Sequence, residues 1–599
     1  MELTGVSVRR HLIILLQLLD LASHASAKAV FAHFMMASAA QYEVDDFKND
    51  ISLAKGSHID AFALNMAYGV STSEQAVANV FNAAESLGFQ LFFSFDYAGN
   101  GSWPQSDVIA FLQKYSLSSA HYKYGGKPFV STFEGPDNAG DWSEIKEQTG
   151  CFFVPDWSSI GAQAALQLAG GVVDGLFSWA AWPTDGQPMD TYIDASYLDN
   201  LKGKPYLMPA SPWFYADMPG YDKDWAYHGD DLWYSRWVEV AFLEPEWVEI
   251  ISWNDYGESH YIGPLNEKGY GVFTTGKAPY NYARNMPHDG WRLQLPYVID
   301  LYKGGTASIT EENLVVWYRT QPGTACAEGQ KQYKDRSFQD RIFFSALLRS
   351  NASVKVSIDG IEKDARWEFE PNGGIGIYHG NFDFDHDHLG ETTVSISRDG
   401  EETVHVNGRA ITETCTDGFA NFNAWVGSAT SGTTFSPVAP KLSLSKQVCI
   451  KGSGSANYTE LCETTCRYGY CPIDTCCCTA MGAQKKRPKP TYEKGTPKSG
   501  DESYSGLCSF ACYYGFCLEA TCSGNQTATH SHPHLGPPAC VGNGDDDRAN
   551  LHNSSCATSG PHAQTTHVSN AFKQAITSVG APFGIGFFIY AGIVFGFYF

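Results

Sequence analysis

Eight apolar runs between Lys28 and about Glu258 constrain the fold of this 599-residue chain more than any other feature. They read KAVFAHFM, DAFALNMAY, FQLFFSFDY, KPFVSTFEG, CFFVPDW, GLFSWAAW, KPYLMPASPWF and EWVEIISWND, with helix-like or loop-like segments between them. Continuously apolar strands, unlike alternating ones, are expected where both faces of a parallel sheet are covered. Eight such units predict an α/β fold built on a (β/α)8 TIM barrel. No Gly-rich dinucleotide fingerprint supports an open, doubly wound sheet.

Two of the intervening segments show clear helical periodicity. One begins with the capping-box pattern Ser71-x-x-Glu74 and ends before Gly88, and the other begins after Pro104. Apolar residues recur along one face of each predicted helix: Val77, Val80, Phe81, Ala84 and Leu87 in the first, and Val108, Phe111, Leu112 and Tyr115 in the second. Both are the connectors that a barrel of alternating strands and helices requires.

A different pattern runs from about Gly304 to Leu444, where VVWYRT, RIFFSALL, SVKVSIDG, TVSISRDG and ETVHVNG read as short strands. Asp399-Gly400 is a hairpin signal. We therefore expect an accessory β-sandwich packed on the barrel. Cys326 and Cys415 could bridge within it, although spacing alone does not fix the pairing.

Cysteines gather near the C-terminus, with 13 of the 16 at or after Cys449. The spacing C-x3-C-x4-C-x4-C occurs twice, within LCETTCRYGYC and LCSFACYYGFC, and marks an internal repeat of two disulfide-rich units. Zinc binding is less favoured because the usual paired short Cys and His spacings are missing from the sequence. The Tyr and Phe residues beside each repeated Gly suit either sugar stacking or a small core.

The two ends of the chain carry targeting patterns. Arg9 and Arg10, an apolar run and Ala25-Ser26-Ala27 predict a secretory signal peptide. An almost wholly apolar stretch, 581–599, follows the small residues Ser569-Asn570-Ala571, which is typical of a glycosylphosphatidylinositol (GPI) attachment signal. A tail anchor or a single membrane helix is the alternative. Five sequons agree with secretion: Asn100, Asn351, Asn457, Asn525 and Asn553.

The sequence thus predicts six consecutive parts. They are a signal peptide (1–27), a catalytic barrel (28–303), a β-sandwich (304–445), two cysteine-rich repeats with a linker (446–525), a Ser/Thr/His-rich spacer (526–570) and a hydrophobic anchor signal (571–599). The linker is assigned to the stretch 485–505, which is rich in Lys, Pro, Gly and Ser.

The net charge of -24 argues against nucleic acid as a partner, because that binding needs clustered Lys and Arg. A neutral polymer fits this charge. In a barrel the active site gathers where the strands end, so polar and aromatic residues at those ends are the candidates. They are His33, Asn65, Asp96, Glu134, Asp156, Trp179, Trp182, Trp213, Trp253, Asp255 and Glu258. Carboxylates bind sugar hydroxyls and aromatic rings pack on sugar C–H faces, so this set favours a carbohydrate substrate.

Asp255 and Glu258 could supply the two carboxyl groups that glycoside hydrolysis needs. Residues three apart in a strand point to opposite faces, so both reach the barrel mouth only if the chain turns after Asp255. Gly257 makes that turn plausible. The alternative is that Asp255 caps a loop and Glu258 is a surface carboxylate. A zinc-dependent hydrolase is less favoured, because the barrel region has no His-x-His or similar ligand cluster.

The motifs KAVFAHFMM, DAFALNMA, FFSFDYAGNG, KPFVSTFEGPDN, FVPDWSS, GLFSWAAWP and ISWNDYGESHYIGP together resemble glycoside hydrolase family 71, the fungal endo-1,3-alpha-glucanases or mutanases. The resemblance spans about 28–444. It implies a (β/α)8 barrel with a β-sandwich, and endo-hydrolysis of α-1,3-glucan with inversion by Asp255 and Glu258. No metal and no other cofactor is implied.

We favour Glu258 as the general acid, with its pKa raised by a partly apolar setting, and Asp255 as the base; the reverse order stays open. The remaining strand-end residues are candidates for binding the glucan. We expect a monomer in the extracellular space, at the cell surface or in the cell wall, held to a membrane by a GPI anchor or a helix. The alternatives are a non-catalytic wall protein that binds glucan, and a hydrolase of another glucan.

Overall fold

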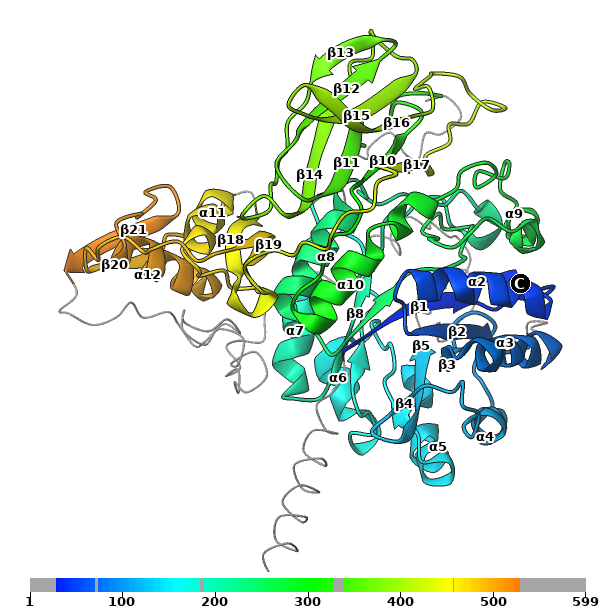
Figure 1. Cartoon of the computed structure of the whole chain (residues 1–599). Coiled ribbons are helices and arrows are strands. Elements are labelled where there is room, and N and C mark those ends of the chain that lie inside the picture. The colour runs from blue at the N-terminus through cyan, green and yellow to red at the C-terminus, as the bar shows by residue number, and fades with distance from the viewer. Residues whose placement is uncertain (1–27, 70–73, 184–187, 327–337, 456, 528–599) are drawn as a thin grey trace, which may run out of the picture.

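The computed structural model describes residues 28–69, 74–183, 188–326, 338–455 and 457–527. All eight strands predicted in the first half are present and run parallel in one strongly curled sheet (Figure 1). They are β1 (Ala29–Met35), β2 (Ala61–Ala67), β3 (Gln90–Asp96), β5 (Lys127–Phe133), β6 (Phe152–Phe153), β7 (Leu176–Phe177), β8 (Tyr206–Ala210) and β9 (Trp247–Ile250). A short antiparallel strand, β4 (Lys123–Tyr124), was not predicted.

The sheet has the order β4-β5-β3-β2-β1-β9-β8-β7, and β6 pairs with β5. Asp156, just after β6, makes one isolated parallel bridge to Phe133 in β5 and another to Phe177 in β7. These two bridges connect the two sides of the curled sheet.

Both faces of the sheet are buried, as the apolar runs predict. Phe31 on β1 joins an inner cluster with Phe92, Phe129 and Trp247, whose rings meet edge to face. The neighbouring side chains on the same strands belong to the larger cluster that packs under the helices. Burial of apolar surface on both sides therefore explains why these strands do not alternate between apolar and polar residues.

Helices connect the strands and cover the outside of the curled sheet (Figure 1). They are α2 (Val44–Gly56), α3 (Glu74–Leu87), α4 (Gln105–Tyr115), α5 (Asp141–Thr149), α6 (Gly161–Gln167), α7 (Tyr192–Leu201), α8 (Leu232–Leu243), α9 (Gly271–Thr275) and α10 (Leu295–Gly304). The predicted helices before Gly88 and after Pro104 are confirmed as α3 and α4, whereas Ser71 of the capping box lies outside the described residues.

The region that follows, here called the accessory unit, contains two four-stranded antiparallel sheets with the orders β14-β11-β10-β17 and β13-β12-β15-β16. Its strands are β10 (Asn313–Arg319), β11 (Arg341–Leu348), β12 (Ser353–Ile358), β13 (Ile361–Asp364), β14 (Gly376–Asp383), β15 (Thr392–Arg398), β16 (Glu401–Asn407) and β17 (Ala424–Thr430). Side chains from both sheets form one hydrophobic cluster.

Two local predictions for the accessory unit are confirmed. Asp399 and Gly400 both have positive φ, 55° and 88°, and join β15 to β16 as a tight hairpin. Cys326 and Cys415 form a disulfide.

The two cysteine repeats have the same architecture and share two disulfides in equivalent positions, and the first repeat has a further disulfide between Cys449 and Cys478. The first consists of β18 (Val448–Gly454), α11 (Thr459–Arg467) and β19 (Cys476–Gly482), and the second of β20 (Glu493–Pro497), α12 (Ser505–Tyr513) and β21 (Cys522–Thr527). In each, the outer two cysteines pair and the inner two pair: Cys462–Cys476 with Cys466–Cys471, and Cys508–Cys522 with Cys512–Cys517. The linker prediction is wrong for Glu493–Pro497, because this stretch pairs with β21.

Aromatic side chains hold the two repeats together. Tyr458 and Tyr504, which occupy equivalent positions in the two repeats, stack with ring centroids 3.5 Å apart. Tyr470 stacks on Phe510 and Tyr468 stacks on Phe516. The small-core interpretation therefore accounts for these rings better than sugar stacking does.

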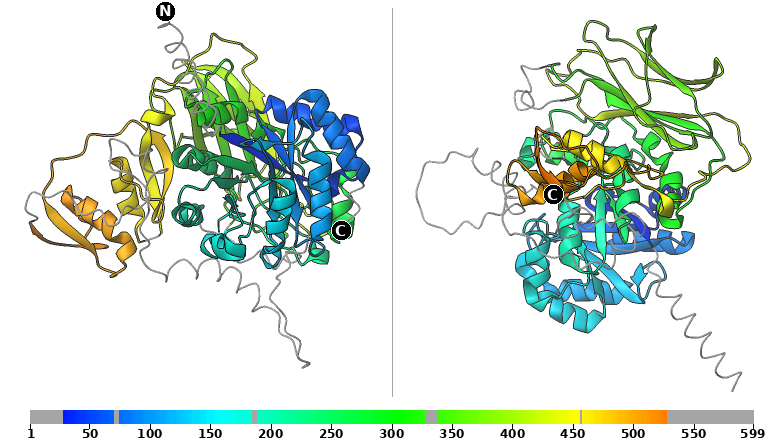
Figure 2. Two further views of the ribbon diagram at one scale, coloured as in Figure 1. Left: turned by 90° about the horizontal axis from the view of Figure 1, so that it is seen from below. Right: turned by 90° about the vertical axis from the view of Figure 1, so that its left-hand side faces the viewer.

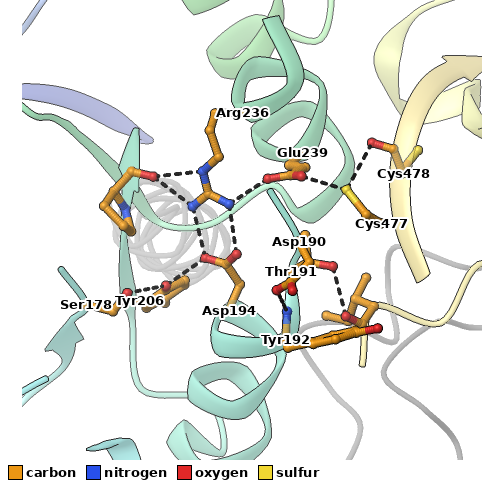
Figure 3. Close-up of polar contacts among 12 residues, drawn as sticks. Ser178, Asp190, Thr191, Tyr192, Asp194, Tyr206, Arg236, Glu239, Cys477 and Cys478 are labelled. Carbon is orange, nitrogen blue, oxygen red and sulfur yellow. Dashed lines mark hydrogen bonds and ion pairs between the residues drawn. The ribbon is translucent and has the colours of Figure 1, made fainter. Parts of the chain in front are cut away.

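The first repeat also packs against α7 and α8 of the first half of the chain (Figures 1 and 2). Thr191 donates to the carbonyl of Ile473 (2.8 Å). Inside this contact the buried Arg236 guanidinium lies between the carboxylates of Asp194 and Glu239, and Glu239 accepts from the thiol of Cys477 at 2.7 Å (Figure 3). Buried polar contacts thus fix the first repeat to the first half of the chain.

Within the part of the chain that the structure describes, no helix is long and apolar enough to cross a bilayer. The apolar C-terminal stretch and the predicted signal peptide both lie outside that part.

Candidate active site

The predicted turn after Asp255 is present. The strand β9 ends at Ile250, and the chain then runs irregularly into a turn over residues 256–259. Asp255 Oδ1 accepts from the backbone N–H of Glu258 (3.1 Å), and the Asp255 N–H donates to Ser252 Oγ (3.0 Å). Asp255 and Glu258 therefore share one turn, here called the catalytic turn (residues 255–258), at the carboxyl end of a central strand.

Glycine is needed at position 257 because of space. A Cβ there would lie 2.9 Å from the Met218 sulfur and 3.1 Å from a methyl carbon of Val272. The catalytic turn is thus packed closely against the segment that carries Met218, which limits how far it can shift.

Glu258 is buried and has two basic partners, Lys223 and His260. Its Oε1 contacts the ammonium of Lys223, and its Oε2 lies 2.9 Å from His260 Nε2. His260 is oriented from its other side, since Nδ1 lies 2.9 Å from Ser252 Oγ. Sequence reasoning did not single out Lys223, and it included His260 only as part of a motif.

The pKa of Glu258 is lowered to about 2. Burial alone would raise it, but the Lys223 ammonium and the hydrogen bond and charge of His260 outweigh burial. The expectation of a raised pKa in a partly apolar setting is therefore wrong, because the side chain faces cations rather than apolar groups.

Asp255, Glu258 and His260 each offer one ligand atom, and these atoms lie within 4.8 Å of one another. Such a group could hold a metal ion by its donor types. However, the Lys223 ammonium already contacts Glu258, and its charge opposes a cation at the same place. The arrangement is better suited to acid–base chemistry.

Three more predicted carboxylates lie at neighbouring strand ends and influence one another. Asp96 accepts from the N–H groups of Ala98 and Gly99 (2.8 Å each), and burial raises its pKa to about 6. Burial also raises the pKa of Glu134 to about 7, with Asp96 as a further cause. Asp156 is fully buried, and burial together with the Glu134 charge raises its pKa well above its usual value.

Glu134 has an unusual backbone conformation, with φ of 51°. A non-glycine residue rarely adopts this conformation outside constrained sites. Its carboxylate accepts from the N–H of Ser159 at 3.0 Å and contacts the Ser159 hydroxyl. The loop after β6 therefore fixes the direction of Glu134 at the rim of the sheet.

The buried His33 is held by a residue that sequence reasoning missed. His33 Nδ1 lies 2.7 Å from Glu249 Oε1, and both side chains are almost fully enclosed. The only signal in the sequence was a glutamate inside the apolar run EWVEIISWND. Asn65, on the neighbouring strand β2, is also buried.

The four predicted tryptophans divide into two pairs. Trp179 and Trp182 are partly exposed; Trp179 packs edge-on against His33, and Trp182 lies 5.3 Å from the His260 ring. Trp213 and Trp253 are fully buried in the core. Trp253 and Trp213 are therefore core residues rather than sugar platforms. The indole N–H of Trp213 donates to the accessory-unit carbonyl of Phe422 (3.1 Å).

This site is of the glycoside hydrolase class: it has a pair of acids on one turn with basic partners for one of them, further carboxylates at adjacent strand ends and two partly exposed tryptophans. A model of one such family, described as glycosyl hydrolase family 71, matches residues 26–438. The chain belongs to this family, as the resemblance of its motifs implies.

Three similar proteins of known description support this family assignment. A mutanase of Penicillium rubens is 33% identical over 427 residues, which cover 69% of this chain and 91% of the mutanase. A glucan endo-1,3-alpha-glucosidase of Schizosaccharomyces pombe is 35% identical over 353 residues, or 55% of this chain and 80% of the relative. An ascus wall endo-1,3-alpha-glucanase of the same yeast is 28% identical over 359 residues, or 56% of this chain and 82% of the relative.

Among solved structures, an endo-alpha-mannosidase from Bacteroides thetaiotaomicron aligns with a TM-score of 0.33 and 12% identity, over 46% of this chain and 97% of that one. This likeness is too weak to support an argument about fold or activity.

Proposed function

We propose that this protein is an endo-hydrolase of α-1,3-glucan in which Asp255 and Glu258 carry out the reaction. The observation that supports it most is the catalytic turn, which brings two carboxyl groups together with the side chains of Lys223 and His260 beyond the end of β9. The names of the three relatives supply the linkage, since each is a mutanase or an endo-1,3-alpha-glucanase. The proposal includes a closed (β/α)8 barrel, with the Asp156 bridges completing the ring, and a β-sandwich formed by the accessory unit.

The charges around Glu258 favour the reverse of the roles expected from sequence. A carboxyl group with a pKa near 2 is ionised when the enzyme works. Glu258 then has no proton to donate as the general acid, and the role left to it is to accept a proton from the attacking water. Asp255 then donates the proton to the glycosidic oxygen as the bond to the anomeric carbon breaks. The proton count balances, because water delivers a hydroxyl to the new reducing end and its proton stays on Glu258.

Inversion at the anomeric carbon is part of the proposal and rests on the family resemblance. Inverting pairs are separated by roughly 6.5–9.5 Å and retaining pairs by about 5–5.5 Å. A carboxylate oxygen of Asp255 and one of Glu258 lie within 4.8 Å of each other. This separation is shorter than that of inverting pairs, so the stereochemistry needs a direct test. Proton NMR of freshly formed product should show the β-anomer first; the α-anomer first would mean retention.

The remaining polar residues at the strand ends are proposed to bind the glucan around the scissile bond. They are His33, Asn65, Asp96, Glu134 and Asp156, with Trp179 and Trp182 as aromatic platforms. Trp213 and Trp253 are not included, because no sugar reaches a fully buried ring.

An extracellular, wall-directed location is proposed from the predicted signal peptide and from the ascus wall relative. The proposed six-part division keeps the boundaries given above, with a GPI anchor replacing the segment 571–599 and a monomeric enzyme at the cell surface. Release of the protein from intact cells by a phosphatidylinositol-specific phospholipase would support the anchor, and retention after treatment would contradict it.

A reducing-sugar assay on insoluble α-1,3-glucan tests the activity, with Asp255→Asn and Glu258→Gln as the variants. Each should lower the rate by about 10²- to 10⁴-fold, the usual contribution of a general acid or base. Glu267→Gln, at an exposed position that follows the turn in the sequence, is the matched control and should keep full activity.

No sugar release by the wild-type protein, with binding to the glucan retained, would favour the non-catalytic wall protein instead. Full activity in either variant would remove that residue from the mechanism. Azide should restore turnover to Glu258→Ala and not to Asp255→Ala if Glu258 is the base. A panel of α-1,4-linked and mixed glucans would identify a different polymer as the substrate.

A further inference from the structure

A short piece of the accessory unit lies against the residues that hold the catalytic turn. This piece, here called the supporting segment, comprises residues 420–424 and leads into β17. The backbone N–H of Asn421 donates to Gln321 of the accessory unit, and that of Asn423 donates to Asn421 Oδ1 (3.0 Å). The segment's carbonyl groups and side-chain amides reach the first half of the chain. Three of its carbonyl groups are acceptors or lie close to a ring nitrogen: Ala420 O accepts from Tyr215 Oη (3.4 Å), Phe422 O accepts from Trp213 Nε1 (3.1 Å), and Ala424 O lies 3.0 Å from His288 Nε2. Its two asparagine side chains are donors. Asn421 Nδ2 donates to Tyr282 O (3.0 Å), and Asn423 Nδ2 donates to Tyr261 Oη (3.0 Å) and to Tyr282 O (3.2 Å).

Two of these partners bind the catalytic turn directly through its backbone. The N–H of Tyr215 donates to the carbonyl of Glu258 (3.1 Å), and the hydroxyl of Tyr282 donates to the carbonyl of Gly257. The peptide groups on either side of the Glu258 Cα are therefore held by two tyrosines. The supporting segment contacts both of these tyrosines from the side away from the turn.

A third partner fixes the chain as it leaves the turn. Tyr261 follows Glu258 by three residues, and its ring stacks on His288 with centroids 4.0 Å apart. The carbonyl of Tyr261 lies 2.8 Å from His288 Nδ1, and its hydroxyl donates to the carbonyl of Met286 while accepting from Asn423. Asn423 thus connects the two ends of this support, Tyr261 and Tyr282.

The residues that make these contacts are buried, so their hydrogen bonds strongly constrain the geometry of the turn. Tyr215, Tyr261, Tyr282 and Asn423 are all fully buried. A buried donor or acceptor cannot exchange its partner for water, so each bond that it makes constrains geometry strongly. The catalytic turn itself lies beyond the end of β9 and has no strand neighbour there, so its position depends on such bonds.

We infer that Asn423 is a positioning residue for glycoside hydrolysis, and that the accessory unit completes the active site by holding the turn that carries Asp255 and Glu258. The inference rests on the proposed function, since it assumes that those two residues react. It gives the accessory unit a role in turnover rather than in substrate capture. Asn423 touches no substrate and acts through Tyr261 and Tyr282.

Asn423→Ala tests the inference in the full-length protein. It removes both donated hydrogen bonds, so kcat for release of reducing sugar should fall roughly 10- to 100-fold, the range that small misplacements of catalytic groups produce. KM should change less than twofold, because the strand-end residues that bind glucan are untouched. Tyr282→Phe removes the hydroxyl that binds Gly257 O from the other side of the support and should lower kcat in the same way.

A matched control separates positioning from general stability. His379 in the accessory unit contacts Asp231 (2.6 Å) across the same interface, far along the chain from the supporting segment. His379→Gln should lower the thermal midpoint without changing kcat per folded molecule, with the folded fraction measured by circular dichroism. The double variant Asn423→Ala/Tyr282→Phe should lose less than the product of the two single losses, because both act on one support.

Three outcomes would overturn the inference. These are an unchanged kcat in Asn423→Ala at equal folded fraction, a loss of kcat in His379→Gln as large as that in Asn423→Ala, and independent effects in the double variant. If Asn423→Ala does not fold, Tyr282→Phe decides by the same kcat criterion. A wild-type protein without glucanase activity would instead refute the proposed function.

Discussion

Two buried glutamates in the first half of the chain, Glu258 and Glu239, both contact a basic side chain, yet their pKa values move in opposite directions. Glu258 shares its site with Lys223 and His260, and its pKa falls to about 2. Burial raises the pKa of Glu239 to about 7, because its one cation, Arg236, is also bound by Asp194. The charges and hydrogen bonds around each carboxylate, rather than burial, decide the sign of the pKa shift.

The clusters around Glu258 and around Arg236 are therefore suited to different tasks. The positive charge beside it keeps Glu258 ionised at the carboxyl end of the sheet. A surplus of carboxylates around Arg236 favours a bound proton on Glu239, which then packs against the thiol of Cys477 in the first cysteine repeat. The first arrangement suits chemistry on a substrate, and the second holds two parts of the chain together.

Arg236→Met should give the largest effect. It leaves Asp194 and Glu239 buried without their cation, so the free energy of unfolding should fall by about 3–5 kcal/mol. Chemical denaturation measures this change, and glucanase activity per folded molecule should stay unchanged. Arg467→Met, at an exposed position in the first repeat, is the control. Equal losses in both variants would mean that the Arg236 cluster has no special role.

Lys223→Met should act on the reaction instead. Without the ammonium, the pKa of Glu258 should rise, and the acid limb of kcat/KM should move up by about one to three pH units. A pH–rate profile measures this shift, with the exposed Lys485→Met as the matched control. An acid limb that stays in place would separate Glu258 from the pH dependence of the reaction.

Glu239→Gln should have the smallest effect and appear only as a change in pH dependence. The folded pKa of about 7 exceeds the ordinary value of 4.5, so the folded protein binds more protons between these values. Stability should therefore be greatest below about pH 4.5 and decline as pH rises through 7. In Glu239→Gln, denaturation midpoints measured from pH 4.5 to 8 should lose this decline; the same slope in both proteins would assign it to other groups.

The parts of the fold that depend on neighbouring residues in the sequence could be predicted. Each parallel strand is continuously apolar because it is covered on two faces, so all eight were visible as runs. The cysteine repeat was equally visible, but the strand Glu493–Pro497 looked like a linker because of its Lys, Pro and Gly content. Its pairing with β21 depends on the disulfides and on α12, which no local pattern reports.

The candidate site was predictable only in part, for a related reason. Asp255 and Glu258 stand in one motif, and the turn that joins them needed only Gly257 and nearby spacing. Lys223 and Glu249 come from separate segments and meet their partners only after folding. Trp213 and Trp253 looked like sugar platforms because a sequence does not show which rings face solvent.

By itself, the sequence determined the order of strands and helices, the duplication of the cysteine unit, the pair of acids and the family. Only the tertiary structure decided the charge state of Glu258 and the support of its turn by Asn423. The reason is physical: apolar periodicity and motif spacing are properties of neighbouring residues. A pKa or the position of an irregular turn depends on charges and hydrogen bonds contributed by segments far apart in the chain.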